Sequence, residues 1–288
     1  MRDLYTEYVE AVALAHQPAM VLDIDIANAA ALPPARRMEV RLYEGASKCI
    51  NALRSLGVRV IMASGRPVSE VYEICERSGL DMQGLEIFGD HGWEYRTAGG
   101  MVGSTTVPQE AQEALLRAAQ LEEAIKAHGG ICELKKASFV VHHRDLSAEQ
   151  ITEIKGLVSE RSRKDHLEPH LKSRGMDGGI DLYVPGRDKG CVVEMAALTT
   201  NVVSLVGDDY TDNDGFKVIR RKREADPNFR GLAVLSRYAK REGFADDHWV
   251  KPPEGLLAFY DRLIEARQRY YASSVLHSLP AAATLKVA

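Results

Sequence analysis

The sequence AMVLDID, at residues 19–25, is the stretch that indicates the fold of this chain. The four apolar residues before Asp23 are typical of a strand that is buried on both faces of a parallel sheet. Asp23 and Asp25 lie two positions apart at the end of this strand. Side chains at that spacing on an extended backbone point the same way, so both carboxylates can face one site.

Short apolar runs alternate with amphipathic segments along most of the chain. This rhythm predicts a Rossmann-like α/β core in which helices cover a parallel sheet. Further strands are expected at residues 58–63, 85–89, 202–206 and 231–235. Helices are expected at residues 44–56 and 254–270, up to residue 78, up to residue 198 and from residue 212, with a mobile tail from Ala272.

A segment in the middle of the chain, residues 108–184, interrupts this rhythm. One helix is expected around residues 114–125 and another near residues 147–163. The strand-like segments of this region lie at residues 131–135, 138–143, 166–171 and 179–184. The mixture predicts a smaller inserted α+β cap domain at residues 108–184, with the core formed by residues 1–107 and 185–288.

Composition excludes several classes of partner. The net charge of −4 leaves no basic surface for nucleic acid, and the basic run at residues 220–223 is typical of a solvated helix end. No apolar run approaches the roughly 20 residues that a membrane span needs. Four cysteines far apart in sequence are typical of reduced thiols, so we expect a cytoplasmic protein.

Polar residues occur at four places where an expected strand ends or a helix begins. In an open parallel sheet, ligands bind at the carboxyl ends of the strands, so these places are expected to converge. Each is a weak signal alone, but the four together, in this order, indicate one site. They are Asp23 with Asp25, Ser64 in SGRP, Lys189 in DKG, and Asp208 with Asp209 and Asp212 in GDDYTDND.

Phosphoryl transfer needs such a set of side chains. One carboxylate can attack phosphorus and form an aspartyl-phosphate, and the other can protonate the leaving oxygen and then activate water. Lys189 and a hard cation would neutralise the charge of the transferring group. Magnesium prefers oxygen ligands, which suits Asp23, Asp208 and a backbone oxygen of Asp25.

These motifs resemble, in order, those of the haloacid dehalogenase superfamily of phosphatases: LDID at residues 22–25, SGRP, DKG and GDDYTDND. More closely, the chain resembles trehalose-6-phosphate phosphatases. GDHGWEY at residues 89–95 is similar to the GxHGxE segment of that group, and CELKKASFVVHHR at residues 132–144 is similar to its cap signature. The resemblance covers about residues 19–265.

The resemblance implies a Mg²⁺-dependent phosphatase of trehalose biosynthesis that acts on trehalose 6-phosphate or a related disaccharide or pseudo-disaccharide phosphate. It implies a small-molecule partner, no nucleic acid or membrane, and a monomer or weak homodimer. Asp23 would be the nucleophile and Asp25 the general acid/base. The other implied roles are phosphate binding by Ser64 and Lys189, metal binding by Asp23, Asp25 and Asp208, support by Asp209 and Asp212, and sugar binding by Arg66, Glu94, Glu133, Lys135, His142 and Arg144.

The first motif departs from the pattern DxDGT of these phosphatases, because Ile26 and Ala27 stand where that pattern has Gly and Thr. A β-branched residue resists the open backbone that Gly permits, and the Thr hydroxyl is lost. Asn28 could supply a replacement polar group. This departure supports a second hypothesis, a catalytically weakened sugar-phosphate-binding or regulatory protein. A response-regulator receiver also combines an Asp cluster, a hydroxyl and a lysine, but the length and the insertion argue against it.

Two patterns have simpler alternatives. Glu133 and Lys135 could form a surface ion pair instead of a sugar site. His166 and His170 have the spacing HxxxH, but Pro169 lies between them and no third metal ligand is near in sequence, so a solvent-facing pair is favoured.

Overall fold

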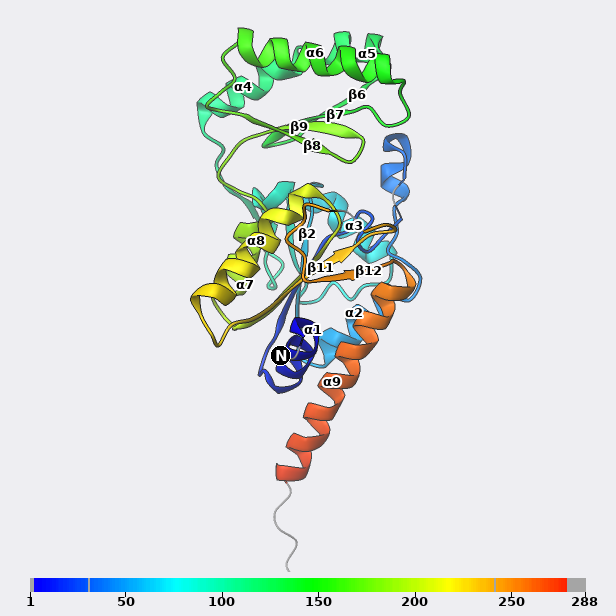
Figure 1. Ribbon diagram of the computed structural model, residues 1–288, viewed down its shortest axis with the longest axis vertical. Coiled ribbons are helices and arrows are strands. Elements are labelled where there is room, and N and C mark those ends of the chain that lie inside the picture. Colours follow the sequence, from blue (N-terminus) through cyan, green and yellow to red (C-terminus); the bar gives the residue numbers. More distant parts are fainter. Residues whose placement is uncertain (1–2, 31, 241, 279–288) are drawn as a thin grey trace, which may run out of the picture.

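The computed structural model, which describes residues 3–30, 32–240 and 242–278, contains two separate β-sheets (Figure 1). The strands of the larger sheet are β1 (Ala19–Leu22), β2 (Arg59–Ala63), β3 (Glu86–Gly89), β4 (Glu94–Arg96), β5 (Val102–Ser104), β10 (Val202–Gly207), β11 (Arg230–Ser236) and β12 (His248–Val250). They lie in the order β12-β11-β10-β1-β2-β3-β4-β5, parallel from β12 to β3 and antiparallel at β4 and β5. The predicted parallel-sheet α/β core is confirmed.

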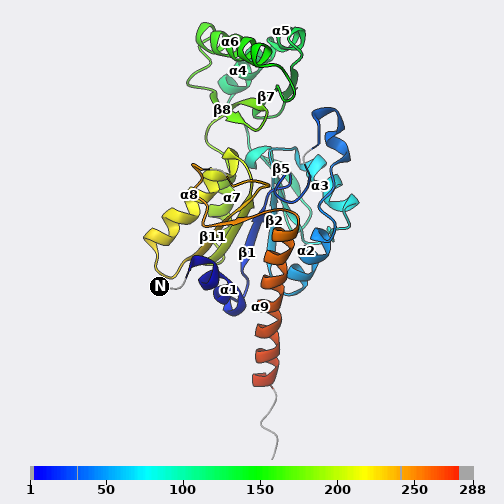
Figure 2. The same cartoon turned by 45° about the vertical axis from the view of Figure 1, so that its right-hand side comes forward.

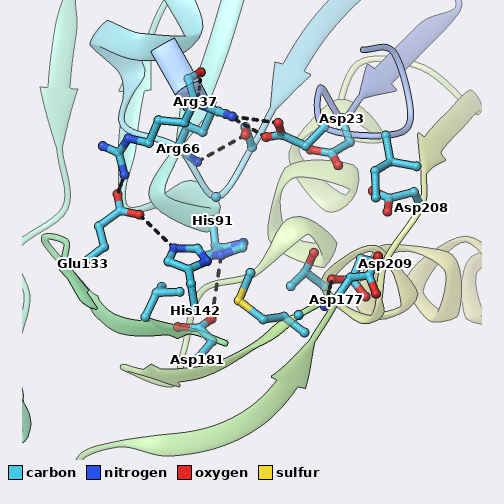
Figure 3. A pocket seen from close by; sticks show the side chains of 18 of the residues that line it. Asp23, Arg37, Arg66, His91, Glu133, His142, Asp177, Asp181, Asp208 and Asp209 are labelled. Carbon is cyan, nitrogen blue, oxygen red and sulfur yellow. Dashed lines mark hydrogen bonds and ion pairs between the residues drawn. The ribbon is translucent and has the colours of Figure 1, made fainter. Parts of the chain in front are cut away.

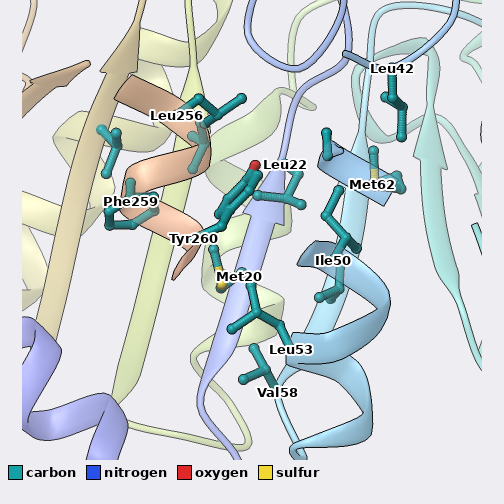
Figure 4. Packing of buried hydrophobic residues seen from close by; sticks show 14 of the residues in the cluster. Met20, Leu22, Leu42, Ile50, Leu53, Val58, Met62, Leu256, Phe259 and Tyr260 are labelled. Carbon is teal, nitrogen blue, oxygen red and sulfur yellow. The ribbon is translucent and has the colours of Figure 1, made fainter. Parts of the chain in front are cut away.

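Strand β1 is buried on both faces because helices cover both sides of the sheet (Figure 2). Met20 and Leu22 pack with one layer of helices, whereas Ala19 and Val21 pack with the other, as the two-residue period of a strand requires. Figure 4 shows Met20 and Leu22 beside side chains of the first layer. That layer contains α1 (Leu4–Leu14), α2 (Ala46–Ser55), α3 (Val68–Arg77) and α9 (Glu254–Ser278), and the opposite layer contains α7 (Lys189–Ala196) and α8 (Tyr210–Ala225).

The smaller sheet is antiparallel and carries its helices on the side away from the core (Figure 1). Its strands, in spatial order, are β6 (Ile131–Leu134), β7 (Ser138–His142), β9 (Gly179–Tyr183) and β8 (Lys172–Met176). Its helices are α4 (Gln109–Ala119), α5 (Glu122–Ala127) and α6 (Ala148–Lys164). A separate hydrophobic cluster joins these helices to the sheet. We propose residues 108–184 as the bounds of this cap domain, as the sequence predicts.

Several sequence-based predictions about individual elements are wrong. The helix expected around residues 114–125 is two helices, α4 and α5. The strand expected at residues 166–171 is absent, because Leu167 and Leu171 instead bury their side chains in the cap core from a turn. The strand that follows, β8, has a polar sequence because it lies at an edge of its sheet. Pattern alone also did not indicate α1, β4, β5 or β12.

Helix α9 extends to Ser278 and therefore includes the first residues of the expected mobile tail, whose remainder lies outside the described residues. One buried charge, Arg267, fastens this helix to α1 and α2. Its guanidinium donates hydrogen bonds to the carbonyl oxygens of Leu56 at 2.9 Å, Val12 at 3.0 Å and Ala15 at 2.6 Å. Among the described residues, no helix, α9 included, is both long and apolar enough to cross a membrane.

We expect Arg267→Met to lower the free energy of unfolding by about 3 kcal/mol, because it leaves three buried or partly buried carbonyl groups without their charged donor. The matched control is Arg262→Met in the same helix, whose guanidinium is half-exposed and pairs only with Glu265 among the contacts described. Urea denaturation of both variants measures the difference. Equal losses in the two variants would mean that the buried arginine does not fasten α9 to the core.

Candidate active site

A cavity of about 190 Å³ lies between the carboxyl ends of β1, β2 and β10 and the smaller sheet (Figure 3). Side chains from both sheets line it. From the core come Asp23, Asp25, Ser64, Arg66, Lys189 and Asp208, and from the cap come Glu133, Lys135, His142 and Arg144. The four motifs of the sequence therefore converge at one place, which is the geometry expected of parallel strands.

Lys189 joins two carboxylates at the centre of this site. It is the first residue of α7, and the Asp188 side chain caps that helix by accepting a hydrogen bond from the Cys191 N–H group. The Lys189 Nζ atom lies 2.8 Å from Asp23 Oδ1 and 2.7 Å from Asp212 Oδ1. All three side chains are buried, so these ion pairs are shielded from solvent.

Asp212 holds the surrounding backbone as well as Lys189. Its second oxygen, Oδ2, accepts hydrogen bonds from the N–H groups of Asp208 and Asp209, each at 3.1 Å. Gly207 makes room for this contact, since a Cβ atom at residue 207 would collide with the Asp212 carboxylate. Asp209 is the N-cap of α8, and its side chain also accepts the N–H of Asp177 in the cap at 3.2 Å. Asp209 and Asp212, the expected supporting residues, thus bond to the cap, to Lys189 and to the backbone of the fourth motif.

Negative charge exceeds positive charge in this buried group. Oxygen atoms of Asp23, Asp208 and Asp212 lie within 4.8 Å of one another, and their cationic partners are Lys189 and, at Asp208, Arg237. Burial raises the pKa of Asp23 to about 7, where the Lys189 charge lowers it and the Asp212 and Asp25 charges add to the rise. Burial and the neighbouring carboxylates also raise the pKa of Asp208 well above its usual value.

The donor set of this group fits a small divalent cation. Its free ligands are carboxylate oxygens, which Mg²⁺ prefers over nitrogen or sulfur. A bound divalent cation would offset the burial and the neighbouring carboxylate charges that raise the pKa values of Asp23 and Asp208. Both oxygens of Asp212 already accept hydrogen bonds, whereas Asp23 is paired through Oδ1 with Lys189 and Asp208 through Oδ2 with Arg237, at 3.4 Å. Among the contacts of the described residues, Asp23 and Asp208 therefore keep one carboxylate oxygen each for a cation. His166 and His170 do not belong to the cluster.

Asp25, the expected acid/base, forms a bidentate ion pair with Arg66. The Arg66 Nε and Nη2 atoms donate to its carboxylate at 2.7 and 2.8 Å. The Asp25 carbonyl accepts the N–H of Ala27 at 2.5 Å. Ser64 lines the cavity, and its hydroxyl accepts the Arg66 N–H at 3.2 Å. Arg66, expected at the sugar, therefore orients Asp25 as well.

The cap contributes a charged cluster around Glu133. Lys135 Nζ lies 3.8 Å and His142 Nε2 lies 3.5 Å from its carboxylate, and Arg37 of the core forms an ion pair with it. Burial alone would raise the pKa of Glu133, but His142, Lys135 and Arg37 together lower it to about 2. Lys135 also donates to the carbonyl of Gly65 at 2.7 Å, so it bridges the cap and the second motif.

The structure places one expected residue elsewhere. Glu94 does not line the cavity, because its carboxylate accepts the N–H of Val68 at 2.9 Å and occupies the first turn of α3. Arg144 does line the cavity, and it lies 3.8 Å from Asp177. The Glu94 carboxylate is used to bind the first N–H group of a helix, so the expected contact of Glu94 with the sugar stays a prediction.

Sequence reasoning missed four titratable residues of the cavity, namely Arg37, His91, Asp177 and Asp181, and also Arg237, which bonds to the cavity residue Asp208. His91 lies within the quoted GDHG segment, so a signal existed. Arg237 donates to the Asp208 carbonyl at 3.0 Å and to Asp177 at 3.2 Å. The loops that carry Arg37 and Asp177 have no pattern in sequence, so only the packing of cap on core indicates these two residues.

Comparison with known sequences gives distant relatives. No protein-family profile matches the chain. It is 26% identical over 241 residues to a protein named phosphoglycolate phosphatase from Methanoculleus marisnigri, covering 80% of this chain and 90% of that protein. It is 23% identical over 235 residues to an uncharacterized glycosyl hydrolase of Mycobacterium tuberculosis, covering 77% of this chain. The chain spans only 16% of the length of that second protein.

Solved structures are similar over most of the chain. The C-terminal domain of trehalose-6-phosphate phosphatase from Candida albicans superposes with a TM-score of 0.71 at 15% identity, covering 91% of this chain and 95% of that one. The C-terminal domain of the trehalose synthase regulatory protein of the same organism gives 0.64 at 12% identity, covering 89% and 97%. A haloacid dehalogenase-like hydrolase from Bacteroides thetaiotaomicron gives 0.59 at 16% identity, covering 86% and 99%.

The protein has the haloacid dehalogenase-like fold. The resemblance inferred from its motifs is confirmed at this level. In this haloacid dehalogenase-like chain, Asp23, Ser64, Lys189 and Asp208 lie at one cavity beneath a cap, as the order of the motifs predicts.

We expect Asp23→Asn to change how the stability of the metal-free protein depends on pH. The pKa of Asp23 is raised in the folded state, so its contribution to stability is present below its usual pKa of 3.8 and is lost as pH rises through about 7. The wild type should therefore lose more thermal stability than Asp23→Asn between about pH 5 and pH 8 in EDTA. Asp145→Asn, at an exposed carboxylate, is the matched control and should follow the wild type. If the melting temperatures of all three proteins changed equally with pH, the raised pKa of Asp23 would be contradicted.

Proposed function

We propose that this protein is a Mg²⁺-dependent phosphatase that transfers the phosphoryl group of a small sugar phosphate to Asp23 and then to water. The observation that carries the proposal is the buried contact of Lys189 with both Asp23 and Asp212, beside Asp208. This arrangement holds one carboxylate at the cavity and places a fixed ammonium next to it. The sequence and structural likeness to phosphatases supports the same function.

Each proposed step uses a group that faces the cavity. A carboxylate oxygen of Asp23 attacks phosphorus, and the bond from phosphorus to the sugar oxygen breaks. Lys189 keeps that carboxylate in place and neutralises charge on the transferring phosphoryl group, while the Ser64 hydroxyl donates to a phosphoryl oxygen. Asp23 and Asp208 would hold a Mg²⁺ ion, which would supply further neutralisation of the phosphate charge.

Asp25 handles the protons in this proposal. It gives a proton to the leaving sugar oxygen and later takes one from the water that attacks the phosphorylated Asp23. Arg66 bonds to both oxygens of Asp25, and a proton transfer from Asp25 to the substrate would weaken at least one of these bonds. Arg66 has a second carboxylate partner, Glu70, at 3.3 Å, which can keep the guanidinium paired during that exchange.

The cap supports the choice of a sugar as the alcohol part of the substrate. Glu133 is an ionised acceptor, and Lys135 and His142 are donors that lie on the cavity wall opposite the Asp23 carboxylate. Hydroxyl groups of a sugar both donate and accept, so they match such a mixed set. The likeness to a trehalose-6-phosphate phosphatase supports a disaccharide phosphate, and we propose trehalose 6-phosphate or a close analogue as the substrate.

The second candidate is a sugar-phosphate-binding regulatory protein. Two observations favour it: the altered motif at Ile26 and Ala27, and the similarity to the domain of a trehalose synthase regulatory protein. Phosphate release from a panel of phosphorylated mono- and disaccharides with Mg²⁺ separates the candidates. Binding of a sugar phosphate without release from any ester would favour the regulatory protein.

We expect Asp23→Asn to reduce turnover by about 10³-fold or more, because an amide oxygen is a poor nucleophile for phosphorus. The fold should persist, and EDTA should abolish wild-type turnover in a way that added Mg²⁺ reverses. Asp145→Asn, at an exposed carboxylate outside the cavity, serves as the control and should retain full turnover. Near-normal turnover by Asp23→Asn would exclude this residue as the nucleophile.

We expect Glu133→Ala and Lys135→Ala to lose at least about tenfold in kcat/KM on the sugar phosphate, because each removes a charged partner of the sugar hydroxyls. Activity on p-nitrophenyl phosphate, which has no such hydroxyls, should change much less. The matched controls are Glu160→Ala and Lys155→Ala, two exposed charges on the cap helix α6. If both esters lose activity equally, the cap cluster serves closure and not recognition of the sugar.

A further inference from the structure

The loop that carries the nucleophile contains a strained residue. Ile26 has a φ angle of 58°, in the left-handed region that a β-branched residue rarely adopts. This is the position where the motif of similar phosphatases has Gly, which adopts that region freely. A residue in this conformation is strained and persists only where the surroundings force it. The backbone at Ile26 therefore adopts the conformation that Gly would adopt freely, and contacts from the surrounding residues must hold it there.

Asn28 supplies the central part of that restraint. The residue is fully buried, and its four polar groups are all bonded. Its side-chain amide donates to the carbonyl oxygen of Asp23 at 2.6 Å. Its backbone N–H donates to Ile24 at 2.9 Å, and its carbonyl accepts from the N–H of Tyr43 at 2.8 Å. Both ends of the strained turn, Asp23 before it and Asn28 after it, are thereby joined directly.

Tyr260 of α9 completes the arrangement. Its hydroxyl donates to Asn28 Oδ1 at 2.5 Å, and the ring lies between α9 and β1 in the core (Figure 4). The Asp23 carbonyl can only accept, so the amide nitrogen of Asn28 must face Asp23, and Oδ1 is left to accept from Tyr260. Without the Tyr260 hydroxyl, Oδ1 would be a buried acceptor without a partner.

Two further side chains bind the carbonyl groups inside the turn. The Tyr43 hydroxyl donates to the Ile26 carbonyl at 2.9 Å, and the Ser236 hydroxyl donates to the Ala27 carbonyl at 2.8 Å. These residues come from the loop before α2 and from the end of β11, so the turn is held from several elements. Of these side chains, Asn28 also bonds to the backbone of the nucleophile, and Tyr260 bonds in turn to Asn28.

We infer that Asn28 and Tyr260 are positioning residues for Asp23, which hold the strained turn at Ile26 so that a chain lacking the motif glycine keeps its nucleophile in place. The inference rests on the proposed function for its catalytic consequence. A small displacement of a reacting group lowers the rate of the chemical step more than it lowers the affinity for substrate. The effect of losing this contact should therefore fall on kcat and should depend on which residue occupies position 26.

Tyr260→Phe tests the inference, with Tyr8→Phe as the matched control. Tyr8 is an equally buried tyrosine of the same hydrophobic cluster, and its hydroxyl bonds to Ser204 at 2.8 Å, away from the turn. We expect Tyr260→Phe to lower kcat about tenfold with KM within about twofold, whereas Tyr8→Phe leaves both within about twofold. Adding Ile26→Gly to Tyr260→Phe should recover most of the lost kcat, because the turn then needs less restraint.

Hydrogen exchange at the Asn28 amide gives a readout that needs no turnover. The backbone N–H of Asn28 should exchange faster in Tyr260→Phe than in the wild type, and at the wild-type rate in Tyr8→Phe. If the wild type hydrolyses no ester, the proposed function fails, and the exchange rates still decide the inference. Equal exchange in both tyrosine variants, or a kcat loss that Ile26→Gly does not reduce, would overturn it.

Discussion

The buried ion pairs of Lys189 with Asp23 and Asp212 are the interaction on which the rest of this site depends. They join the end of β1, the start of α7 and the start of α8, three elements that are far apart in sequence. A lone buried carboxylate would be protonated or unstable, whereas a paired one can remain ionised at the cavity. The same contact aligns the Asp208 backbone through Asp212. Stability and chemistry therefore depend on the same three side chains.

The cap extends this charged system outward. Arg37 and Lys135 connect the core loops to Glu133 and Gly65, and Arg237 connects Asp208 to the cap turn at Asp177. These contacts cross the boundary between the two sheets, so the position of the cap is coupled to the charges around the phosphate site. Closure would exclude water from the cavity and strengthen each electrostatic contact within it.

Much of the fold and part of the site could be predicted from sequence, because β1 and the motif residues follow simple periodicities. Lys189 and Asp208 are found by their places at a helix start and a strand end. The strand predicted at residues 166–171 is absent because Leu167 and Leu171 are buried in the cap core from a turn, and the sequence does not distinguish this from burial in a strand. Glu94 caps a helix that its motif does not reveal, and Arg37 reaches the cavity only through tertiary packing.

The central claim is that Asp23 receives the phosphoryl group. Its most direct test is a rapid acid quench of the protein during turnover of a sugar phosphate with Mg²⁺, followed by borohydride reduction and peptide mass spectrometry. An acyl phosphate on Asp23 would be reduced to homoserine at that position alone, and this is the result we expect. Steady release of phosphate with Asp23 unmodified, or with homoserine at another position, would contradict the account.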